Sequence, residues 1–277
     1  MAVKRVLLPV SGGSNSESLS DTAFHLAERF SAQVLGLFVQ LPDLVIPYFD
    51  VTGMEEPLIL LETAKESRRE AAERAQATFK ACAERFPHVE SVFRSVRDDV
   101  EASFVKYSRL ADLSVIAPPD PSENGFWGSP YWLNVQNATL FRSGRPVLFV
   151  PPHSIQPNFD TVVIAWKESL EAARAIAAAR PFMKLAREVH LFAVTNGRDD
   201  VSSLREAEEY LSLHYDEVHS ETVAGDEVGK LLLAQAYRQG ALLIMGAFSH
   251  WRWRERLLGG ATEYVLREAS IPVLMMH

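Results

Sequence analysis

The sequence predicts an α/β protein made of two tandem, doubly wound parallel sheets. Three observations support this prediction. Short apolar runs alternate with segments of helical periodicity, the same order of segments occurs twice, and glycines stand where an apolar run ends near the C-terminus. Strands that alternate with helices form parallel βαβ units with right-handed crossovers. In such sheets ligands bind at the carboxyl ends of the strands.

The first half of the chain alternates five apolar runs with helical patterns. After the first run, apolar residues at positions 19, 23, 26, 27 and 30 lie on one helical face. The long charged segment 56–86 predicts a second helix, and residues 100–111 and 134–141 predict two more. The strands of this half are expected at residues 6–10, 34–39, 89–95, 113–117 and 146–150.

The second half repeats this order. Its strands are expected at residues 162–166, 189–194, 218–223, 242–246 and 272–276, and its helices at 169–186, 203–214, 227–238 and 261–269. Asp98-Asp99 corresponds to Asp226-Glu227, and both pairs come at a predicted helix start, where acidic side chains favour the helix dipole. We therefore expect one domain over residues 1–151 and a second over 159–277. The proline-rich segment 152–158 would be a stiff linker between them.

The composition limits the classes of partner. Of the 277 residues, 47% are hydrophobic and 23% charged, which is typical of a soluble globular protein. The net charge of −8 argues against nonspecific binding to nucleic acid or to an anionic membrane. The first apolar run is too short for a secretory signal, and no 18 apolar residues run together, so a cytoplasmic protein is expected. The single cysteine, Cys82, lies in a predicted helix and is interpreted as a buried packing residue.

The C-terminal segment has the features of a phosphate-binding loop. An apolar run stops at Gly246, a polar and basic loop follows, and Gly259-Gly260 precede a helix that begins at Ala261. Glycines let backbone N–H groups approach an anion closely, and a helix N-terminus supplies partial positive charge. The segment therefore indicates nucleotide binding more than any other function.

Two aromatic loops admit alternative interpretations. Residues 251–256 hold three arginines and two tryptophans. They form either a lid over phosphates and a base, or a solvated basic loop with one tryptophan packed on the surface. Residues 126–132 are more apolar. They either bind an apolar ligand or pack against the other domain or a second chain, and the interface is the favoured interpretation.

No catalytic or metal-binding constellation is evident in the sequence. The eight histidines lack metal-ligand spacing, and among them only His250 lies in the candidate site. Nucleophile-elbow, zinc-protease and paired-cysteine motifs do not occur. We therefore expect no catalytic residues and no metal ligands.

The chain resembles the universal stress protein family in its tandem form, over nearly its whole length. The resemblance is strongest at residues 142–151, 164–175 and 246–276. It implies Rossmann-like domains of the adenine nucleotide alpha hydrolase type. Family dimers join through their last strands, so the resemblance also implies that residues 146–150 and 272–276 pair within this chain as an intrachain pseudo-dimer.

The family's nucleotide-binding members carry the motif Gly-x2-Gly-x9-Gly-(Ser/Thr) after the fourth strand. Here Gly246 takes the first position, Ser249 replaces the second glycine, Gly259 takes the third and Gly260 takes the hydroxyl position, with Thr262 nearby. The family's aspartate after the first strand is replaced by Ser11 in the first half and by Lys167 in the second. Lys167 either pairs with a phosphate, fills the pocket or points into solvent. The end of the second strand, at Val194, would hold adenine through main-chain groups.

The first half departs further from the motif, because Ala117-Pro118-Pro119 stands where Gly246 stands in the second half. Prolines remove backbone donors from the cradle, so this half is expected not to bind nucleotide. The resemblance implies a stress-response or regulatory protein that binds ATP or AMP, with Mg, in the second domain and at most hydrolyses ATP slowly. It leaves the protein partner unidentified and a homodimer open. The alternative is an interaction or scaffold protein of the same fold that binds no nucleotide.

Overall fold

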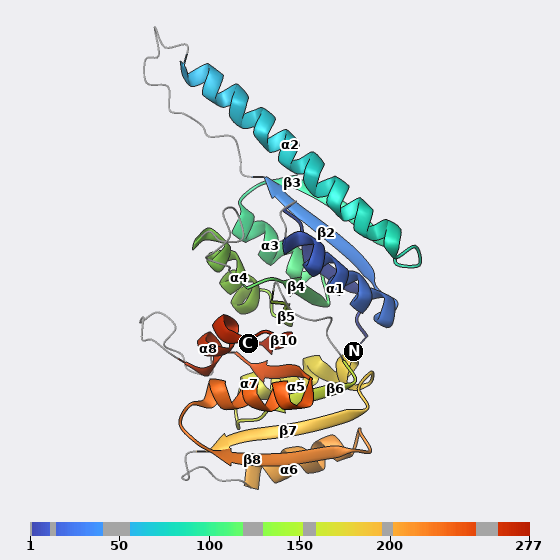
Figure 1. The fold of residues 1–277 in the computed structure, drawn as a ribbon, viewed down its shortest axis with the longest axis vertical. Helices are drawn as coiled ribbons and strands as arrows, with labels where there is room; N and C mark the ends of the chain where they lie inside the picture. Colours follow the sequence, from blue (N-terminus) through green and yellow to red (C-terminus); the bar gives the residue numbers. More distant parts are fainter. Residues whose placement is uncertain are drawn as a thin grey trace.

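The structure is a computed structural model that describes residues 2–11, 15–40, 56–118, 130–151, 159–195, 202–247 and 260–277. In these residues ten strands form one sheet, in the order β3-β2-β1-β4-β5-β10-β9-β6-β7-β8, with helices on both of its faces (Figure 1).

The first half contributes the strands β1 (Arg5–Pro9), β2 (Gln33–Gln40), β3 (Ser91–Arg97), β4 (Leu113–Ile116) and β5 (Val147–Phe149). Its helices are α1 (Asn15–Phe30), α2 (Glu56–Arg85), α3 (Val100–Arg109) and α4 (Pro130–Arg142). The strands lie close to the expected positions. Helix α4 begins four residues earlier than expected, at Pro130, whose missing N–H is tolerated in a first helical turn.

The second half contributes β6 (Thr161–Ala165), β7 (Glu188–Thr195), β8 (Val218–Ala224), β9 (Leu242–Gly246) and β10 (Val273–Met276). Its helices are α5 (Leu170–Met183), α6 (Ser202–Ser212), α7 (Val228–Gln239) and α8 (Ala261–Glu268). Its strand order, read inward from β8, repeats that of the first half read inward from β3. The predicted fold class, two tandem doubly wound units, is confirmed.

The two halves join at the centre of the sheet. Strands pair in parallel within each half, whereas β5 and β10 pair antiparallel, with Leu148 opposite Leu274. This is the pairing that the family resemblance implied. Helices of the two halves are also in contact, because the ring centroids of Phe30 in α1 and Phe182 in α5 lie 5.1 Å apart, edge to face. The strands of both halves therefore belong to one continuous sheet.

The core is a layer of aliphatic strand residues covered by helices. The four residues of β4 are all buried, as parallel strands covered on both faces require. Cys82 is also buried, as expected, and its thiol donates a hydrogen bond to Asp21 Oδ1 over 3.3 Å. Within the described part of the chain, no helix is long and apolar enough to cross a membrane.

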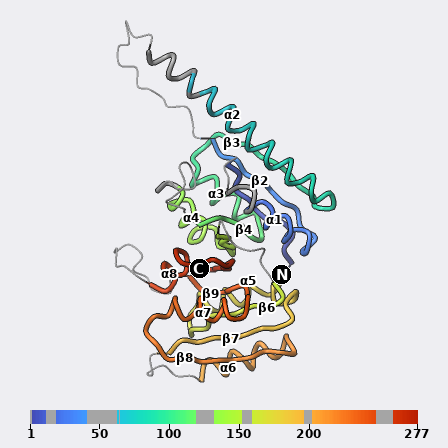
Figure 2. The backbone as a smooth tube through the Cα atoms, viewed as in Figure 1, coloured from blue at the N-terminus to red at the C-terminus, as the bar shows by residue number. Residues whose placement is uncertain are grey.

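Helix α2 breaks the symmetry between the halves. It has 30 residues, about 45 Å at the usual helical rise, whereas α6 at the corresponding place has 11. Ala75, Phe79 and Cys82 anchor its carboxyl half, and Phe79 lies over Gly36, where an added Cβ would stand 2.4 Å from the ring. Helix α2 extends past the ends of β2 and β3 (Figures 1 and 2).

Candidate functional site

The carboxyl edge of the second half brings together residues from three neighbouring strands. β6 lies between β7 and β9 in the sheet, so the ends of all three strands meet. Lys167 follows β6, Val194 is the second-last residue of β7, and Gly246 is the last residue of β9. Gly260, Ala261 and Thr262 stand at the start of α8. Ser249, His250, Gly259 and the loop 251–256 lie outside the described residues.

Gly246 is in close contact with the first turn of α5. A Cβ at this position would stand 2.6 Å from the carbonyl carbon of Glu171 and 2.7 Å from the backbone nitrogen of Ala172. Any larger residue would therefore push α5 away from the sheet. This glycine serves helix–strand packing, whether or not a ligand is bound.

The backbone directly after Gly246 is already hydrogen-bonded. The Ala247 N–H donates to the Met276 carbonyl over 2.9 Å, and the His277 ring nitrogen Nδ1 lies 2.9 Å from the Ala247 carbonyl. The His277 ring also meets Phe141 of α4 edge to face, with centroids 4.8 Å apart. Ala247 thus holds the strand end in place, and anion contacts would come from residues further along the chain.

Helix α8 begins without a side-chain cap. Gly260 is its N-cap residue, in extended conformation, exposed, and without a side chain to accept from the first-turn N–H groups. Among the described residues, an added Cβ at Gly260 would meet nothing within 4 Å. Thr262 is 6% exposed, so it faces inward, unlike Gly260. The positive end of the helix dipole therefore lies at an open position, which suits an anion.

Lys167 and Trp166 line the end of β6. Lys167 is exposed and makes no ion pair or hydrogen bond with the residues that the structure describes. The Trp166 backbone N–H donates to the Phe192 carbonyl over 2.8 Å, and its indole N–H lies 3.4 Å from Ser203 Oγ. Among the residues that the structure describes, the lysine is thus a cation without a carboxylate partner.

A groove of about 340 Å³ adjoins this edge between α5 and α6. Its charged residues are Glu168 and Glu206, and Trp166, Ser203 and Tyr210 contribute its other polar and aromatic groups. Sequence reasoning did not identify this groove. Trp166, directly before Lys167, was the available signal, but the sequence does not show that α5 and α6 leave a gap beside it.

The corresponding edge of the first half contains a buried indole. Trp132 is fully buried, donates its indole N–H to the Ala117 carbonyl over 3.0 Å and meets Phe104 edge to face at 5.7 Å. The expectation that the aromatic segment 126–132 forms an interface is therefore wrong for Trp132, which is a core residue because its only polar atom finds a backbone partner inside. Residues 126–129 lie outside the described part of the chain.

The acidic pairs at helix starts divide into two cases. The Asp99 side chain accepts a hydrogen bond from the Ala102 N–H over 2.7 Å, so it caps α3 as expected. Glu227 precedes α7 but makes no cap hydrogen bond, and its carboxylate pairs with Lys230 at 3.0 Å instead.

Among the described residues, no group of histidine, cysteine and acidic side chains could hold a metal ion.

These features define a tandem doubly wound α/β protein whose second half has a glycine-lined strand edge that carries Lys167. Residues 166–277 match the model of the Universal stress protein family. The resemblance seen in the sequence is thereby confirmed.

Solved structures extend the fold match over the whole chain. A universal stress protein from Archaeoglobus fulgidus DSM 4304 is 21% identical, with 98% of this chain and 97% of that chain covered and a TM-score of 0.66. A functionally unknown protein from Pseudomonas aeruginosa PAO1 is 15% identical, with coverages of 99% and 92% and a TM-score of 0.58.

The same fold also occurs in another context. The cytoplasmic domain of a prokaryotic cation chloride cotransporter is 12% identical, with coverages of 99% and 95% and a TM-score of 0.51. No curated protein matches the chain significantly. At these identities the structural matches establish the fold, and function has to be argued from the site.

Proposed function

We propose that the second half binds an adenine nucleotide, ATP or AMP, at the carboxyl edge of β6 and β9, and that binding serves a stress-response or regulatory role. The observation that carries the proposal is the uncapped N-terminus of α8 at Gly260, which opens at the switch point of a doubly wound sheet. The match of residues 166–277 to the universal stress protein family model supports it.

Each residue of the proposed site has a distinct role. The backbone N–H groups at Gly260, Ala261 and Thr262 would face the phosphates, as would those of Ser249 and Gly259 in the same loop. Lys167 would neutralise phosphate charge, with His250 as a second contact, and main-chain groups at Val194 would meet adenine. Bound Mg²⁺ would be held mainly by the phosphates, as this ion usually is in nucleotide sites. The acidic residues nearest Lys167 in the chain are Glu168 and Glu171.

The role is binding rather than turnover. No general base is assigned near the proposed phosphates, so hydrolysis would at most be slow. The chain would act as two domains, residues 1–151 and 159–277 joined by 152–158, with nucleotide only in the second. We place this function in the cytoplasm, with a protein partner or a second copy as the receiver of the signal.

A scaffold protein without nucleotide is the second candidate. Its support is that Gly246 is explained by the contact with α5 and that the Ala247 backbone is already bonded. In that case the motif would persist only because the fold needs it.

Calorimetric titration with Mg-ATP separates the two candidates. One site per chain with micromolar affinity is expected, and Gly260→Asp should abolish it, because a carboxylate would stand at the helix N-terminus in place of phosphate. Ser270→Asp adds the same charge at an exposed position beyond the other end of α8 and is the control. Unchanged affinity in Gly260→Asp would move the site elsewhere. Absence of heat at millimolar ATP, at two temperatures, would favour the scaffold.

A further inference from the structure

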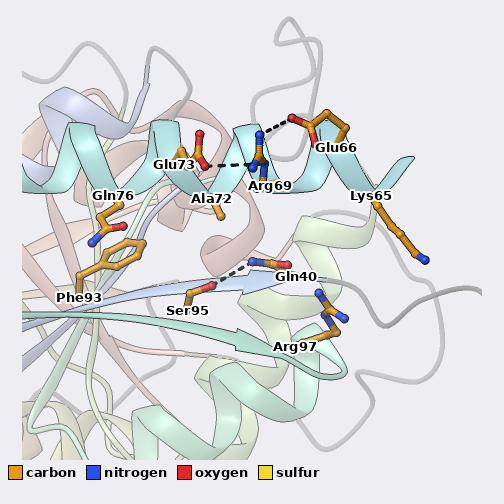
Figure 3. A pocket seen from close by; sticks show the side chains of 10 residues that line it. All are labelled: Gln40, Lys65, Glu66, Arg69, Ala72, Glu73, Gln76, Phe93, Ser95 and Arg97. Atoms are coloured by element: carbon orange, nitrogen blue, oxygen red, sulfur yellow. Dashed lines mark hydrogen bonds and ion pairs between the residues drawn. The ribbon is translucent and has the colours of Figure 1, made fainter. Parts of the chain in front are cut away.

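The first half contains a larger groove, far along the sheet from the proposed nucleotide site. It has a volume of about 400 Å³ and lies between α2 and the strands β2 and β3 (Figure 3). This volume falls within the range of small-molecule sites. Gln40 and Arg97 are the last residues of β2 and β3, so the groove opens at the carboxyl ends of parallel strands, where doubly wound sheets bind ligands.

The groove exists because α2 continues past the point where its large side chains pack on the sheet. Phe79 fills the space over Gly36, but one to two turns earlier the helix presents Ala72 and Gln76 to the groove. Alternate residues of β3, Phe93, Ser95 and Arg97, point to the same face of the strand. A small side chain on the helix opposite this row leaves the space open.

The two ends of the groove differ in chemistry. Phe93 and Gln76 lie at one end, and Arg97 and Lys65 lie toward the other (Figure 3). Between them, the Gln40 side-chain amide donates to Ser95 Oγ over 3.1 Å. Phe93 and Arg97 are four residues apart on one strand, which corresponds to about 13 Å. A molecule of that length would have an aromatic contact at one end and cations at the other.

The charges of the groove favour a single negative charge on the ligand. Glu66 and Glu73 both pair with Arg69, at 2.7 Å and 3.8 Å, so the two carboxylates more than neutralise that guanidinium. Lys65 makes no ion pair or hydrogen bond within the described residues. Three cations and two carboxylates line the groove, so its net charge is weakly positive. The two carboxylates would repel a polyphosphate, whereas one carboxylate or phosphate group could lie at the Arg97 end.

The second half of the chain shows whether the fold itself requires the residues of this groove. By the strand registers, Ser220, Thr222 and Ala224 of β8 take the positions of Phe93, Ser95 and Arg97, and Thr195 takes that of Gln40. The helix beside β8 is the short α6. The same fold therefore forms without the aromatic residue, the arginine or the long helix, so none of the three is a requirement of the fold.

We infer that this groove binds a small organic monoanion, with a carboxylate or phosphate group at Arg97 and Lys65 and a flat apolar body on Phe93. The site goes beyond the proposed function, because it lies in the other half of the chain and selects a different ligand. The groove at the ends of β2 and β3 would thus give the first half a ligand of its own, while Ala117, which corresponds to Gly246, accepts a hydrogen bond from the buried Trp132.

The test uses the fluorescent monoanion 8-anilinonaphthalene-1-sulfonate, whose aromatic body and single sulfonate match the groove. The intact chain is expected to bind it saturably at one site. Arg97→Gln should weaken binding about tenfold, the effect of one hydrogen-bonded charge. Ala72→Trp should abolish binding by filling the groove. Arg94→Gln is the matched control, since Arg94 lies over the Tyr107 ring at 5.6 Å and on the other face of β3.

Competitors identify the charged group and separate this site from the nucleotide site. Naphthalene-1-carboxylate and 1-naphthyl phosphate should displace the probe, and their relative strength shows which group is preferred. Neutral naphthalene-1-methanol and Mg-ATP should not. Unchanged affinity in Arg97→Gln and Ala72→Trp, or displacement by the neutral alcohol, would overturn the inference. Displacement by Mg-ATP would also overturn it, by placing the probe in the nucleotide site, whereas failure of Mg-ATP to bind leaves this result unaffected.

Discussion

Gly246 and Ala172 touch through their backbones, so closely that a Cβ on Gly246 would stand 2.7 Å from the Ala172 nitrogen. The end of β9 and the first turn of α5 are therefore in direct contact at the edge where the nucleotide site is proposed. Ser169 caps the same turn, because its hydroxyl accepts from the Ala172 N–H over 3.2 Å. A glycine expected to serve phosphate binding is thus also required by the packing of the fold.

Gly246→Ala should lower the free energy of unfolding by about 1–3 kcal/mol, the usual cost of overpacking. The methyl group would meet backbone atoms of α5, which cannot move away as a flexible side chain would. Urea unfolding followed by circular dichroism measures the change. Gly260→Ala is the control, with a smaller cost of about 0.5–1 kcal/mol, because alanine is a poorer N-cap residue than glycine. Equal losses in both variants would contradict the argument.

Gly260→Ser should restore the hydroxyl that the family's nucleotide-binding members have at this position. The side chain has room beside the described residues, since none of their atoms lies within 4 Å of an added Cβ. A hydrogen bond to a charged phosphate corresponds to about a tenfold gain in affinity. Calorimetry with Mg-ATP measures the gain, and Gly260→Ala, which lacks the hydroxyl, should not show it. A tighter alanine variant would assign the effect to helix conformation instead.

The Cys82 thiol should be unreactive in the folded protein. Burial, with a hydrogen bond to the Asp21 carboxylate, raises the pKa of Cys82 to about 12. At pH 8 only about one thiol in ten thousand is then ionised, and the thiolate is the reactive form. Labelling by iodoacetamide should be negligible in buffer and fast in urea. Comparable rates in both conditions would show that the thiol is accessible.

The same pKa shift makes stability depend on alkaline pH. Because the folded-state pKa lies above the ordinary value of the thiol, the unfolded chain loses its proton first as pH rises. The stability that Cys82 contributes is fully present below about pH 9 and is lost progressively toward pH 12. Urea titrations of the wild type and Cys82→Ala should therefore show a steeper decline for the wild type over this range.

Phe30 and Phe182 should couple the stability of the two halves. Their rings meet edge to face at 5.1 Å between α1 and α5. Such pairs contribute about 0.5–1.5 kcal/mol beyond their buried area. A double-mutant cycle of Phe30→Leu and Phe182→Leu in urea should show a coupling energy of this size. Strict additivity would mean that this ring pair does not couple the halves.

Trp132→Phe should destabilise the chain by about 1–3 kcal/mol, because it leaves the buried Ala117 carbonyl without its indole partner. Trp166→Phe is the matched control. Its indole N–H lies 3.4 Å from Ser203 Oγ at a partly exposed position, where water can replace the lost bond. Similar losses in the two variants would contradict the role assigned to the Trp132 hydrogen bond.

Much of the candidate site could be located from the sequence alone. Lys167, Val194 and Gly246 do come together, because the ends of adjacent parallel strands meet wherever the strands themselves are correctly placed. The burial of Trp132 could not be foreseen, since an aromatic loop residue packs inward only if a backbone acceptor waits inside, here Ala117. The Gly246 contact likewise depends on where α5 rests on the sheet.

By itself the sequence determined the repeated βα order and the burial of Cys82, because hydrophobic periodicity records which face of each element is covered. Only the tertiary structure decided how far α2 extends past β3 and which residues face each other across the groove. It also decided that Gly246 packs directly against the first turn of α5. These features join residues distant in the chain, and their distances depend on how whole elements pack, which no local pattern encodes.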